Sequence, residues 1–466
     1  MSSTPEQRSQ VGPYAGYYNR PPAAGDDLLT KVGPGTPCGT YLRRYWHPFL
    51  IASELKDLPL PVRLLGEDLV VFRDGSARLG LLHRHCAHRG TSLEFGIPAE
   101  RGIRCCYHGW HFDVDGTILD TPSEPAGSRI KQNFCQGAYP VRESHGLLFA
   151  YLGPPEHTPE LPVYDTFTHP AGSRLANFRL EYPCNWLQVV ENAADPIHNA
   201  YLHAIVSGLQ FSAAFRALPV LDFVETPLGF LSMATRKVND FVFTRSSDII
   251  LPNLGQFAGG SNPVNAESFF VGAFTTRWVT PVDDHNCFYI GIRNINDSNV
   301  SSRQRKLDES MFGVGRLGII GQTPDRPYEE RQREPGDYDA CVSQGLIVNR
   351  KAEHLGTTDR GVVMLRRMLM RAIQAIERGE PPTVPRLVRG GNAVRTYCHE
   401  FVYRADPDAG MDDRSRLEAF GRRAAQIVVD TDGLPPAERE VVARERIRDM
   451  LKREEPARRS AQTPAS

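Results

Sequence analysis

The sequence predicts an α+β protein with a small β-sandwich domain followed by a larger domain that combines a sheet with long helices. At 466 residues the chain exceeds one typical domain and should bury at least two cores. Residues 41–155 contain short strand-like segments separated by tight turns, which is typical of a β-sandwich. Several strand-like runs between residues 218 and 295 precede a long helical pattern, and this order indicates an α+β domain.

Composition divides the chain into four segments. Residues 1–40 are rich in proline and glycine and are expected to form an extended N-terminal segment. The stretch from Gly153 to Pro159 is the strongest candidate for a domain boundary, so we assign residues 41–155 to the first domain and 156–435 to the second. Residues 436–466 are strongly charged and predict a helix followed by a disordered tail.

The first domain shows the alternation expected of strands. Residues 62–65 and 68–72 are two strand-like runs separated by Gly66 and Glu67. Residues 110–114 alternate between apolar and polar side chains before an Asp115-Gly116 turn, and residues 146–152 predict a buried strand.

The second domain begins with a strand at residues 177–182 and a helical stretch around residues 185–202. Strands are predicted at residues 269–274 and 287–292, with the polar residues 283–286 between them as a hairpin turn. Asp359 can begin a helix, Gly379 can end it, and four apolar residues recur at helical spacing between them. These are Val362, Leu365, Leu369 and Ile376.

Composition also limits the partners and the location of the protein. A net charge of -1 with 23% charged residues suggests neither a nucleic-acid nor a membrane partner. Residues 1–18 lack a signal pattern, and no apolar run approaches the roughly 20 residues that span a bilayer. Nine cysteines without a spaced disulfide framework fit a reducing compartment, so we expect a cytoplasmic protein.

Two short stretches combine one cysteine and one histidine each. Cys86 and His88 are followed after sixteen residues by Cys105, Cys106 and His108. Two thiolates and two imidazoles suit a 2Fe–2S cluster in which one iron has two cysteine ligands and the other has two histidines. A structural zinc site is the alternative, although zinc fingers usually pair cysteine with cysteine and histidine with histidine.

These loops resemble the Rieske centres of ring-hydroxylating oxygenases. The family patterns Cys-x-His-Arg-Gly and Cys-x-Tyr-His-Gly-Trp are matched here, including Arg89, Gly90, Gly109 and Trp110. The resemblance implies that Cys105 is the ligand and that Cys106 stands where the family more often has proline. Respiratory Rieske subunits have an extra cysteine in each loop, where this chain has Thr91 and Tyr107.

A second candidate site lies between Glu191 and His203. Positions five apart on a straight helix point about 140° away from each other, so His198 and His203 could share a metal only if the helix is distorted near Pro196. Two imidazoles and one carboxylate would form the facial triad that holds non-haem Fe(II), whereas hydrogen-bonded core histidines are the alternative.

The segment resembles the Asn-x-x-Asp-x-x-His-x4-His signature of Rieske oxygenases. The resemblance implies that His198 and His203 bind the mononuclear iron. It also implies that Asp195 is the catalytic aspartate that links one of these histidines to a cluster histidine of a neighbouring subunit. A helix-capping or surface role for Asp195 is the alternative.

The third iron ligand must come from later in the chain, where Asp337 and Asp339 are both candidates. In the phthalate dioxygenase branch, the ligand lies eight residues before the glycine of a motif like Gln/Met-Gly-x-Ile-x-x-Arg, which is followed by Glu-x-Leu-Gly-x-x-Asp. The residues that reproduce this frame are Gly345, Ile347, Arg350, Glu353, Leu355, Gly356 and Asp359. The resemblance therefore selects Asp337, with Asp339 as the second choice.

The resemblance, which runs from about Arg43 to Arg367, implies an N-terminal Rieske β-sandwich domain and a C-terminal helix-grip catalytic domain with a central antiparallel sheet. It also implies the terminal oxygenase component of a multicomponent system. A flavin and iron–sulfur reductase would pass electrons from NAD(P)H to the cluster, and dioxygen would be activated at Fe(II). A homotrimer is expected, because the cluster of one subunit would serve the iron of the next.

The family resemblance implies an aromatic substrate, with an aromatic carboxylate or an aryl ether as the expected class. The reaction would be hydroxylation, dihydroxylation or O-demethylation. Arginines suit carboxylate binding and aromatic side chains suit a planar ring. The candidates are Arg216, Arg236, Arg293, Phe211, Phe215 and Trp278. The alternative function is a Rieske electron carrier whose long domain binds a partner, which would require His198, His203 and Asp337 to lie apart.

Overall fold

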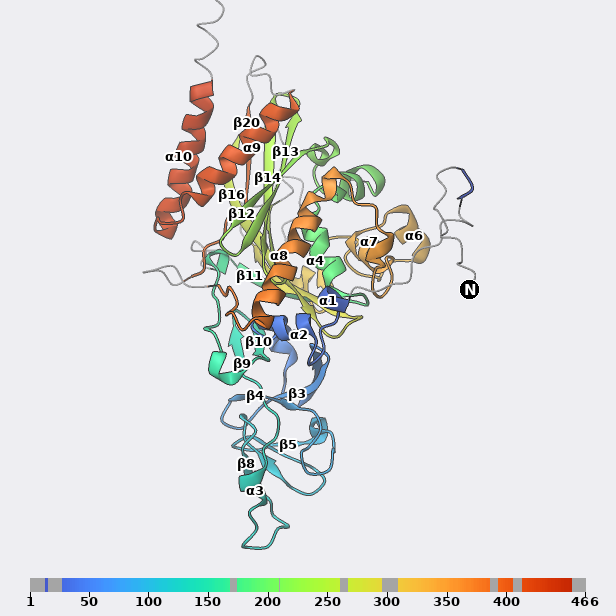
Figure 1. Cartoon of the computed structure of the whole chain (residues 1–466), viewed down its shortest axis with the longest axis vertical. Coiled ribbons are helices and arrows are strands. Elements are labelled where there is room, and N and C mark those ends of the chain that lie inside the picture. The colour runs from blue at the N-terminus through green and yellow to red at the C-terminus, as the bar shows by residue number, and fades with distance from the viewer. Residues whose placement is uncertain are drawn as a thin grey trace, which may run out of the picture.

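The computed structural model describes residues 13–15, 27–167, 174–208, 210–259, 267–295, 309–385, 393–404 and 413–454. A large antiparallel sheet with its helices forms one end of the molecule, and a group of small sheets forms the other end (Figure 1). This arrangement confirms the predicted α+β class. The predicted disordered tail and most of the predicted extended N-terminal segment lie outside the described residues.

The large domain is built on an eight-stranded antiparallel sheet. Its strand order is β11-β17-β16-β15-β14-β13-β12, and β20 pairs with β14 and β16. The strands are β11 (Arg174–Tyr182), β12 (Val220–Thr226), β13 (Gly229–Val238), β14 (Phe241–Ile250), β15 (Leu254–Ala258), β16 (Ser268–Pro281), β17 (Cys287–Ile295) and β20 (His399–Arg404). All of these pairings are antiparallel, as predicted for the central sheet.

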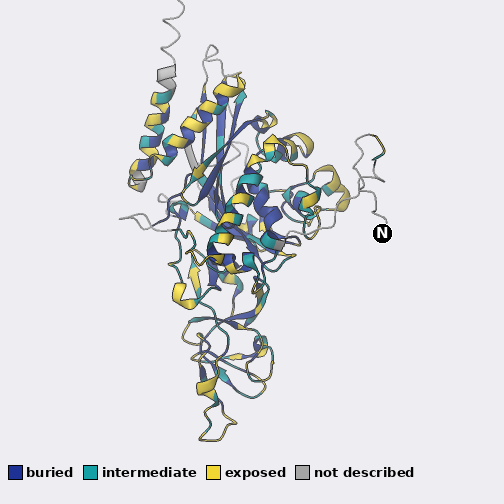
Figure 2. Cartoon of the chain, in the orientation of Figure 1, coloured by how far each residue is buried: buried dark blue, intermediate teal, exposed yellow. Residues whose placement is uncertain are grey.

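Helices cover this sheet. Helix α4 (Trp186–Ala194) packs against β14, β15 and β16 and against α8 (Arg360–Glu377), while α9 (Arg414–Val429) packs against β12 and β13. The inner faces of these helices are buried and their outer faces are exposed, as Figure 2 shows. Helix α10 (Pro436–Glu454) lies in the charged C-terminal segment and contacts α9. None of the helices in the described ranges is long and apolar enough to cross a lipid bilayer.

Helix α8 forms where the sequence predicts it. Val362, Leu365, Leu369 and Ile376 are all buried on one side of the helix. Gly379 follows the helix with a φ of +81°, a left-handed conformation that glycine adopts without strain. Asp359 occupies the N-cap of the helix, but its carboxylate accepts a hydrogen bond from the backbone N–H of Gly356 rather than from an N–H of the helix.

The N-terminal domain contains three small sheets with the orders β1-β10-β9, β2-β3-β4 and β5-β6-β7-β8. The strands are β1 (Trp46–Ile51), β2 (Leu60–Leu64), β3 (Glu67–Arg73), β4 (Leu79–His83), β5 (Ile97–Pro98), β6 (Ile103–Arg104), β7 (His111–Phe112), β8 (Ile118–Asp120), β9 (Val141–Ser144) and β10 (Leu147–Tyr151). The strand predicted at residues 110–114 is shorter than expected. The strand ends at Phe112, where the register with β8 shifts, and the Asp113 N–H then donates to the carbonyl of Thr117 across the turn.

Residues 27–42 correct the prediction of an extended N-terminal segment. They form the short helices α1 (Asp27–Thr30) and α2 (Pro37–Leu42). The hydroxyl of Thr36 accepts a hydrogen bond from the backbone of Gly39, and Pro37 occupies the first helical position, where a missing N–H costs nothing. Gly33, Pro34 and Gly35, which contributed to the prediction, lie in the turn between these helices, and Pro21 and Pro22 lie outside the described residues.

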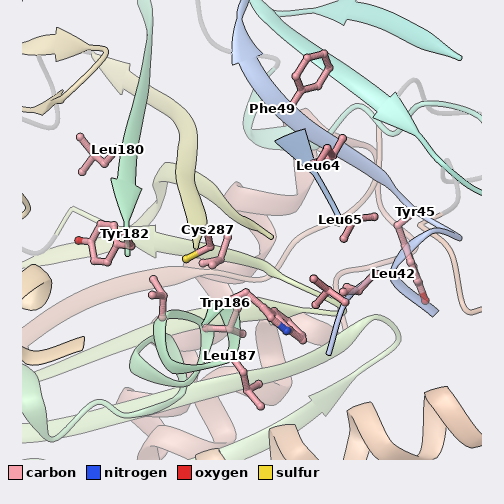
Figure 3. Packing of buried hydrophobic residues seen from close by; sticks show 14 of the residues in the cluster. Leu42, Tyr45, Phe49, Leu64, Leu65, Leu180, Tyr182, Trp186, Leu187 and Cys287 are labelled. Atoms are coloured by element: carbon pink, nitrogen blue, oxygen red, sulfur yellow. The ribbon is translucent and has the colours of Figure 1, made fainter. Parts of the chain in front are cut away.

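The two domains share one hydrophobic core. The largest buried cluster contains Leu42, Phe49 and Leu64 from the first part of the chain and Leu180 and Trp186 from the second. Figure 3 shows these side chains packed together, although they come from elements more than 100 residues apart. Helix α4 is also tied to α1, because Trp186 Nε1 donates a hydrogen bond to the carbonyl of Leu29 at 3.2 Å. The proline-rich stretch after Gly153 therefore joins two domains that pack as one body.

Candidate functional site

The two cysteine-histidine loops lie at the end of the molecule farthest from the large sheet, between β4 and β5 and between β6 and β7 (Figure 1). Each loop closes with a backbone hydrogen bond from a glycine N–H to the cysteine carbonyl, 2.8 Å for Gly90 to Cys86 and 3.1 Å for Gly109 to Cys105. Both glycines have a φ near +75°, which other residues adopt only with strain. The two loops therefore have the same tight geometry and project from short strands.

Of the four predicted cluster ligands, the two cysteines are buried and the two histidines are partly exposed. Cys86 and Cys105 are only 3% and 4% exposed, whereas His88 and His108 are partly exposed, with ring centroids 4.7 Å apart. Burial and the neighbouring Cys105 thiol raise the pKa of Cys86 to about 11, so a positively charged partner such as iron is needed to hold it as a thiolate. Cys106 is exposed, whereas Cys105 is buried beside Cys86.

Gln136 supports the first loop through hydrogen bonds that its local sequence does not predict. Its side-chain amide donates to the carbonyls of His83 and His85 at 2.8 and 2.9 Å, and its oxygen accepts from the backbone of Ala87 at 2.7 Å. The side chain is 2% exposed. Gln136 therefore satisfies three backbone groups that flank Cys86.

The second candidate site begins where helix α4 ends. Asp195 occupies the C-terminal cap of α4, and Pro196 prevents the helix from continuing. The chain then forms a short turn of α-helix, His198–Ala200, followed by a π-helix, Tyr201–Val206. Because a π-helix forms i→i+5 hydrogen bonds, residues five apart lie one above the other. The predicted distortion therefore occurs, and it turns His198 and His203 toward a common point.

The donor atoms of three predicted residues converge. Asp337 Oδ1 lies 3.2 Å from His203 Nε2 and 3.6 Å from His198 Nε2, and one donor atom from each residue lies within 4.8 Å of the other two. Two ligands about 2.1 Å from a common ion and roughly perpendicular to each other lie about 3 Å apart. The set thus fits a transition-metal ion. It also contradicts the alternative of a carrier, which requires these residues to lie apart.

Asp337 is the first residue of helix α7 (Asp337–Val342), and its charge is stabilised by its neighbours. Burial alone would raise its pKa, but the imidazole of His203, then that of His198, holds the pKa of Asp337 far below its usual range. Asp339 does not reach the site. Its carboxylate accepts from Arg331 at 2.7 Å and from the backbone of Gly336 at 3.0 Å.

Asp195 lies beside His198, with Oδ2 3.7 Å from Nδ1 of the imidazole. The backbone carbonyl of Asp195 also contacts Nδ1 of His198. Burial would raise the pKa of Asp195, but its hydrogen bond to His198 and the charge of that imidazole lower the pKa below the ordinary value. Its side chain remains 30% exposed. Asp195 is therefore an accessible carboxylate in contact with one member of the triad.

Three amide side chains surround the triad. Gln210 Oε1 lies 2.7 Å from His203 Nδ1, Gln322 Nε2 donates to Asp337 Oδ2 at 2.5 Å, and Asn192 Nδ2 donates to Asp337 Oδ1 at 3.1 Å. Asn192 belongs to the signature that identifies the segment. Gln210 and Gln322 carry no such signal, because nothing in their local sequence marks them.

The triad lies in the wall of a cavity of about 420 Å³. Of the predicted pocket residues, Arg293 and Phe211 line it, whereas four others do not. Arg216 donates to the carbonyl of Ala204 instead. Arg236 is 1% exposed and covered by the rings of Phe215 and Phe243. Phe215 is itself buried in a hydrophobic cluster that also contains Phe243. Trp278 packs against Phe149 in a separate core cluster, since neighbouring side chains of a strand point to opposite faces.

Two further arginines line the cavity and were not predicted. Arg245 lies on β14 and Arg277 on β16. Arg277 is 2% exposed and lies over the ring of Tyr289, and Arg293 is 5% exposed and lies over the ring of Phe274. In the described part of the chain, neither Arg277 nor Arg293 has a carboxylate partner, and the Nε atom of each lacks a hydrogen bond.

Comparison with known proteins agrees with this geometry. Residues 45–139 match the family model described as a Rieske [2Fe-2S] domain. The chain is 41% identical over 426 residues to the tert-butanol monooxygenase / tert-amyl alcohol desaturase oxygenase subunit of Aquincola tertiaricarbonis, covering 88% of this chain and 90% of the relative. It is 31% identical to the phthalate 4,5-dioxygenase oxygenase subunit of Pseudomonas putida, covering 87% and 97%. The crystal structure of dicamba monooxygenase with non-haem iron and dicamba has the same fold, with a TM-score of 0.51 at 17% identity, covering 73% of this chain and 99% of that one.

Fold and site together define an oxidoreductase that contains an iron–sulfur domain and a separate mononuclear iron domain. The identity to full-length relatives is high enough to be more specific. This chain belongs to the Rieske non-haem iron oxygenases and is one of their oxygenase subunits, with a 2Fe–2S cluster and a mononuclear iron as cofactors. The alternative of a structural zinc site in the first domain is therefore wrong.

Proposed function

We propose that this protein is the terminal oxygenase component of a multicomponent system that hydroxylates, dihydroxylates or O-demethylates a small aromatic substrate bearing a carboxylate. The observation that carries the proposal is the convergence of His198, His203 and Asp337 in the wall of a cavity that also contains unpaired arginines. The proposal includes aryl ethers that carry an acidic group.

The proposal gives each donor set one task. Cys86, His88, Cys105 and His108 hold the cluster, and His198, His203 and Asp337 hold the iron. The cluster would supply single electrons, and the iron would supply open positions at which dioxygen is activated. Asp195 orients His198 through Nδ1, and its carboxylate would accept a hydrogen bond from a cluster histidine of a neighbouring subunit.

The arginines support an anionic substrate. A buried guanidinium without a counter-ion is costly, and a bound carboxylate that pairs with it offsets that cost. Burial, with a smaller effect of the charge on Arg245, lowers the pKa of Arg293 to about 9, so an anion that pairs with this guanidinium would favour its charged form. Arg277 and Arg293 lie on the adjacent strands β16 and β17, where Arg277 pairs with Gly291 and Arg293 with Thr275, so both can reach one ligand. The rings of Tyr289 and Phe274 beside them suit a planar substrate.

The same proposal needs partners. The cluster loops lie in the small-sheet end of the molecule and the triad lies beside α4 and α7 in the large domain, so we infer that electrons pass between copies in a head-to-tail homotrimer (Figure 1). Exposed apolar side chains at both places support such contacts. They are Phe95, Ile97 and Tyr107 near the cluster loops, and Tyr201, Ile205 and Val206 on the π-helix of the triad. A flavin and iron–sulfur reductase would supply electrons from NAD(P)H. All nine cysteines are unpaired, which supports a location in the cytoplasm.

Metal analysis tests the enzyme assignment. About three irons and two sulfides per chain are expected, whereas two of each would support an electron carrier without catalytic iron.

A substrate screen tests the anionic substrate. Dioxygen consumption and product formation are measured with a compatible reductase for aromatic carboxylates, neutral aryl ethers and tertiary alcohols. We expect coupled turnover with the carboxylates, and we expect Arg277→Gln and Arg293→Gln to raise KM for them. Arg216→Gln is the control, because Arg216 lies outside the cavity. Efficient conversion of the neutral compounds with unchanged KM in both cavity variants would contradict the proposal.

A further inference from the structure

The two carboxylate oxygens of Asp337 have different surroundings. Oδ1 faces both imidazoles, at 3.2 Å from His203 Nε2 and 3.6 Å from His198 Nε2, and it also accepts a hydrogen bond from Asn192 Nδ2 at 3.1 Å. Oδ2 accepts a hydrogen bond from Gln322 Nε2 at 2.5 Å. An ion that binds both imidazole nitrogens therefore lies on the Oδ1 side of the carboxylate.

Gln322 is held in one orientation. The hydroxyl of Tyr182 donates to Gln322 Oε1 at 3.3 Å, so the amide nitrogen is the atom that faces Asp337. Gln322 is 3% exposed and Tyr182 is 1% exposed, and the ring of Tyr182 stacks on Tyr289 with centroids 5.7 Å apart. Reversing the amide would place its oxygen against a carboxylate oxygen of Asp337, which is repulsive, whereas the Tyr182 hydroxyl can pair with either amide atom. Asp337 therefore fixes the orientation of the amide, and Tyr182 holds its other end.

We propose that Gln322 is a positioning residue that makes Asp337 a ligand through Oδ1 alone. A carboxylate that binds an ion through both oxygens must place them at similar distances from it, and the hydrogen bond from Gln322 holds Oδ2 away from that arrangement. Two imidazoles and one oxygen would occupy three positions of a six-coordinate iron and would leave three positions open. A ligand carboxylate bound through two oxygens would leave two. The inference rests on the proposed function only in that iron occupies this triad.

The test compares Gln322→Met, which keeps the length of the side chain but removes the donor, with Gln256→Met. Gln256 is a matched control because it is also buried and donates to Thr166 and Thr276, yet contacts none of the three donor residues. The affinity for Fe(II) is measured by competition with a chelator, and the coordination of the bound Fe(II) is followed by near-infrared magnetic circular dichroism. Neither measurement needs turnover.

We expect Gln322→Met to weaken Fe(II) binding by about tenfold or more and to change the coordination spectrum, with the cluster absorption unchanged. Gln256→Met should keep both. Tyr182→Phe, which removes only the hydroxyl, should produce a smaller loss of affinity in the same direction, and it serves as the test if Gln322→Met does not fold. Wild-type affinity and spectrum in Gln322→Met, or in Tyr182→Phe where that variant stands in, would overturn the inference. If His203→Ala also keeps the third iron, the proposed function fails instead.

Discussion

The imidazole rings of His198 and His203 lie 5.4 Å apart, centre to centre, although their positions differ by five in a segment predicted to be helical. On an α-helix they would point in nearly opposite directions. The end of α4 at Asp195 and the π-helix that begins at Tyr201 bring them onto one side. The irregular helix thus allows one short segment to supply both histidines of the triad.

Replacing His203 by alanine should remove the mononuclear iron and spare the cluster. His203 is 1% exposed and far from the cysteine-histidine loops, so iron should fall from about three to about two per chain while sulfide stays at two. The visible spectrum of the cluster should persist and turnover should be lost. His285→Ala, in the exposed turn between β16 and β17, is the control. Retention of the third iron would remove His203 from the ligand set.

Replacing Asp195 by asparagine should keep both metals and slow the transfer of electrons between them. The amide has the same shape but lacks the charge that stabilises the imidazole of His198. Reoxidation of the reduced cluster in a single turnover, followed by its absorbance after mixing with dioxygen and substrate, should slow by about 10-fold to 100-fold. Asp240→Asn, in the exposed hairpin between β13 and β14, should behave as wild type. Normal kinetics in Asp195→Asn would contradict the bridging role.

Sequence patterns predicted the parts of this molecule that depend on nearby residues. The cysteine-histidine loops, helix α8 and the turn at residues 283–286 each depend on local spacing and on glycine or capping residues, so they could be recognised before any fold was known. The choice of Asp337 over Asp339 depended on a longer frame. In the structure Asp337 lies with the two histidines, whereas the carboxylate of Asp339 accepts a hydrogen bond from Arg331.

The supporting residues could not be predicted, because they come from distant parts of the chain. Gln136, Gln210 and Gln322 each contact a ligand or its loop only after folding, and a lone glutamine carries no local signal. The cavity arginines were missed for a related reason. Which face of a strand points into the cavity depends on the register of the sheet, and this register separates Arg277 from its neighbour Trp278.

Replacing Gln136 by leucine should destabilise the cluster loop. The change leaves the carbonyls of His83 and His85 and the N–H of Ala87 without their buried partner, which costs about 1–3 kcal/mol per unsatisfied group. The absorbance of the cluster should therefore be lost at a lower temperature during a thermal ramp. Gln132→Leu, in the exposed helix α3 (Ile130–Asn133), is the control. The same bleaching temperature in Gln136→Leu and wild type would show that Gln136 does not support the loop.

Glu67 should make the stability of the N-terminal domain depend on pH. Its carboxylate accepts from Tyr139 at 2.6 Å and from Arg43 at 2.8 Å, and it lies 3.5 Å from His83. Burial would raise its pKa, but hydrogen bonds from His83, Tyr139 and Arg43 lower it from 4.5 to about 2. Because the folded pKa is depressed, this contribution to stability is present above about pH 4.5 and is lost as the pH falls toward 2.

The matched variant is Glu67→Gln, which keeps the shape of the side chain but cannot ionise. At pH 7 we expect it to lower the free energy of unfolding by about 2 kcal/mol, since charge-assisted hydrogen bonds become neutral ones. The difference in unfolding free energy between wild type and variant should stay constant from pH 7 to pH 6. It should then narrow below about pH 4.5, where Glu67 of the unfolded chain takes up a proton and the ionised carboxylate of the folded protein stabilises less. Urea midpoints of both proteins, followed by circular dichroism from pH 7 to pH 3, measure this gap. A gap that stays constant down to pH 3 would mean that Glu67 is not held ionised by these three partners.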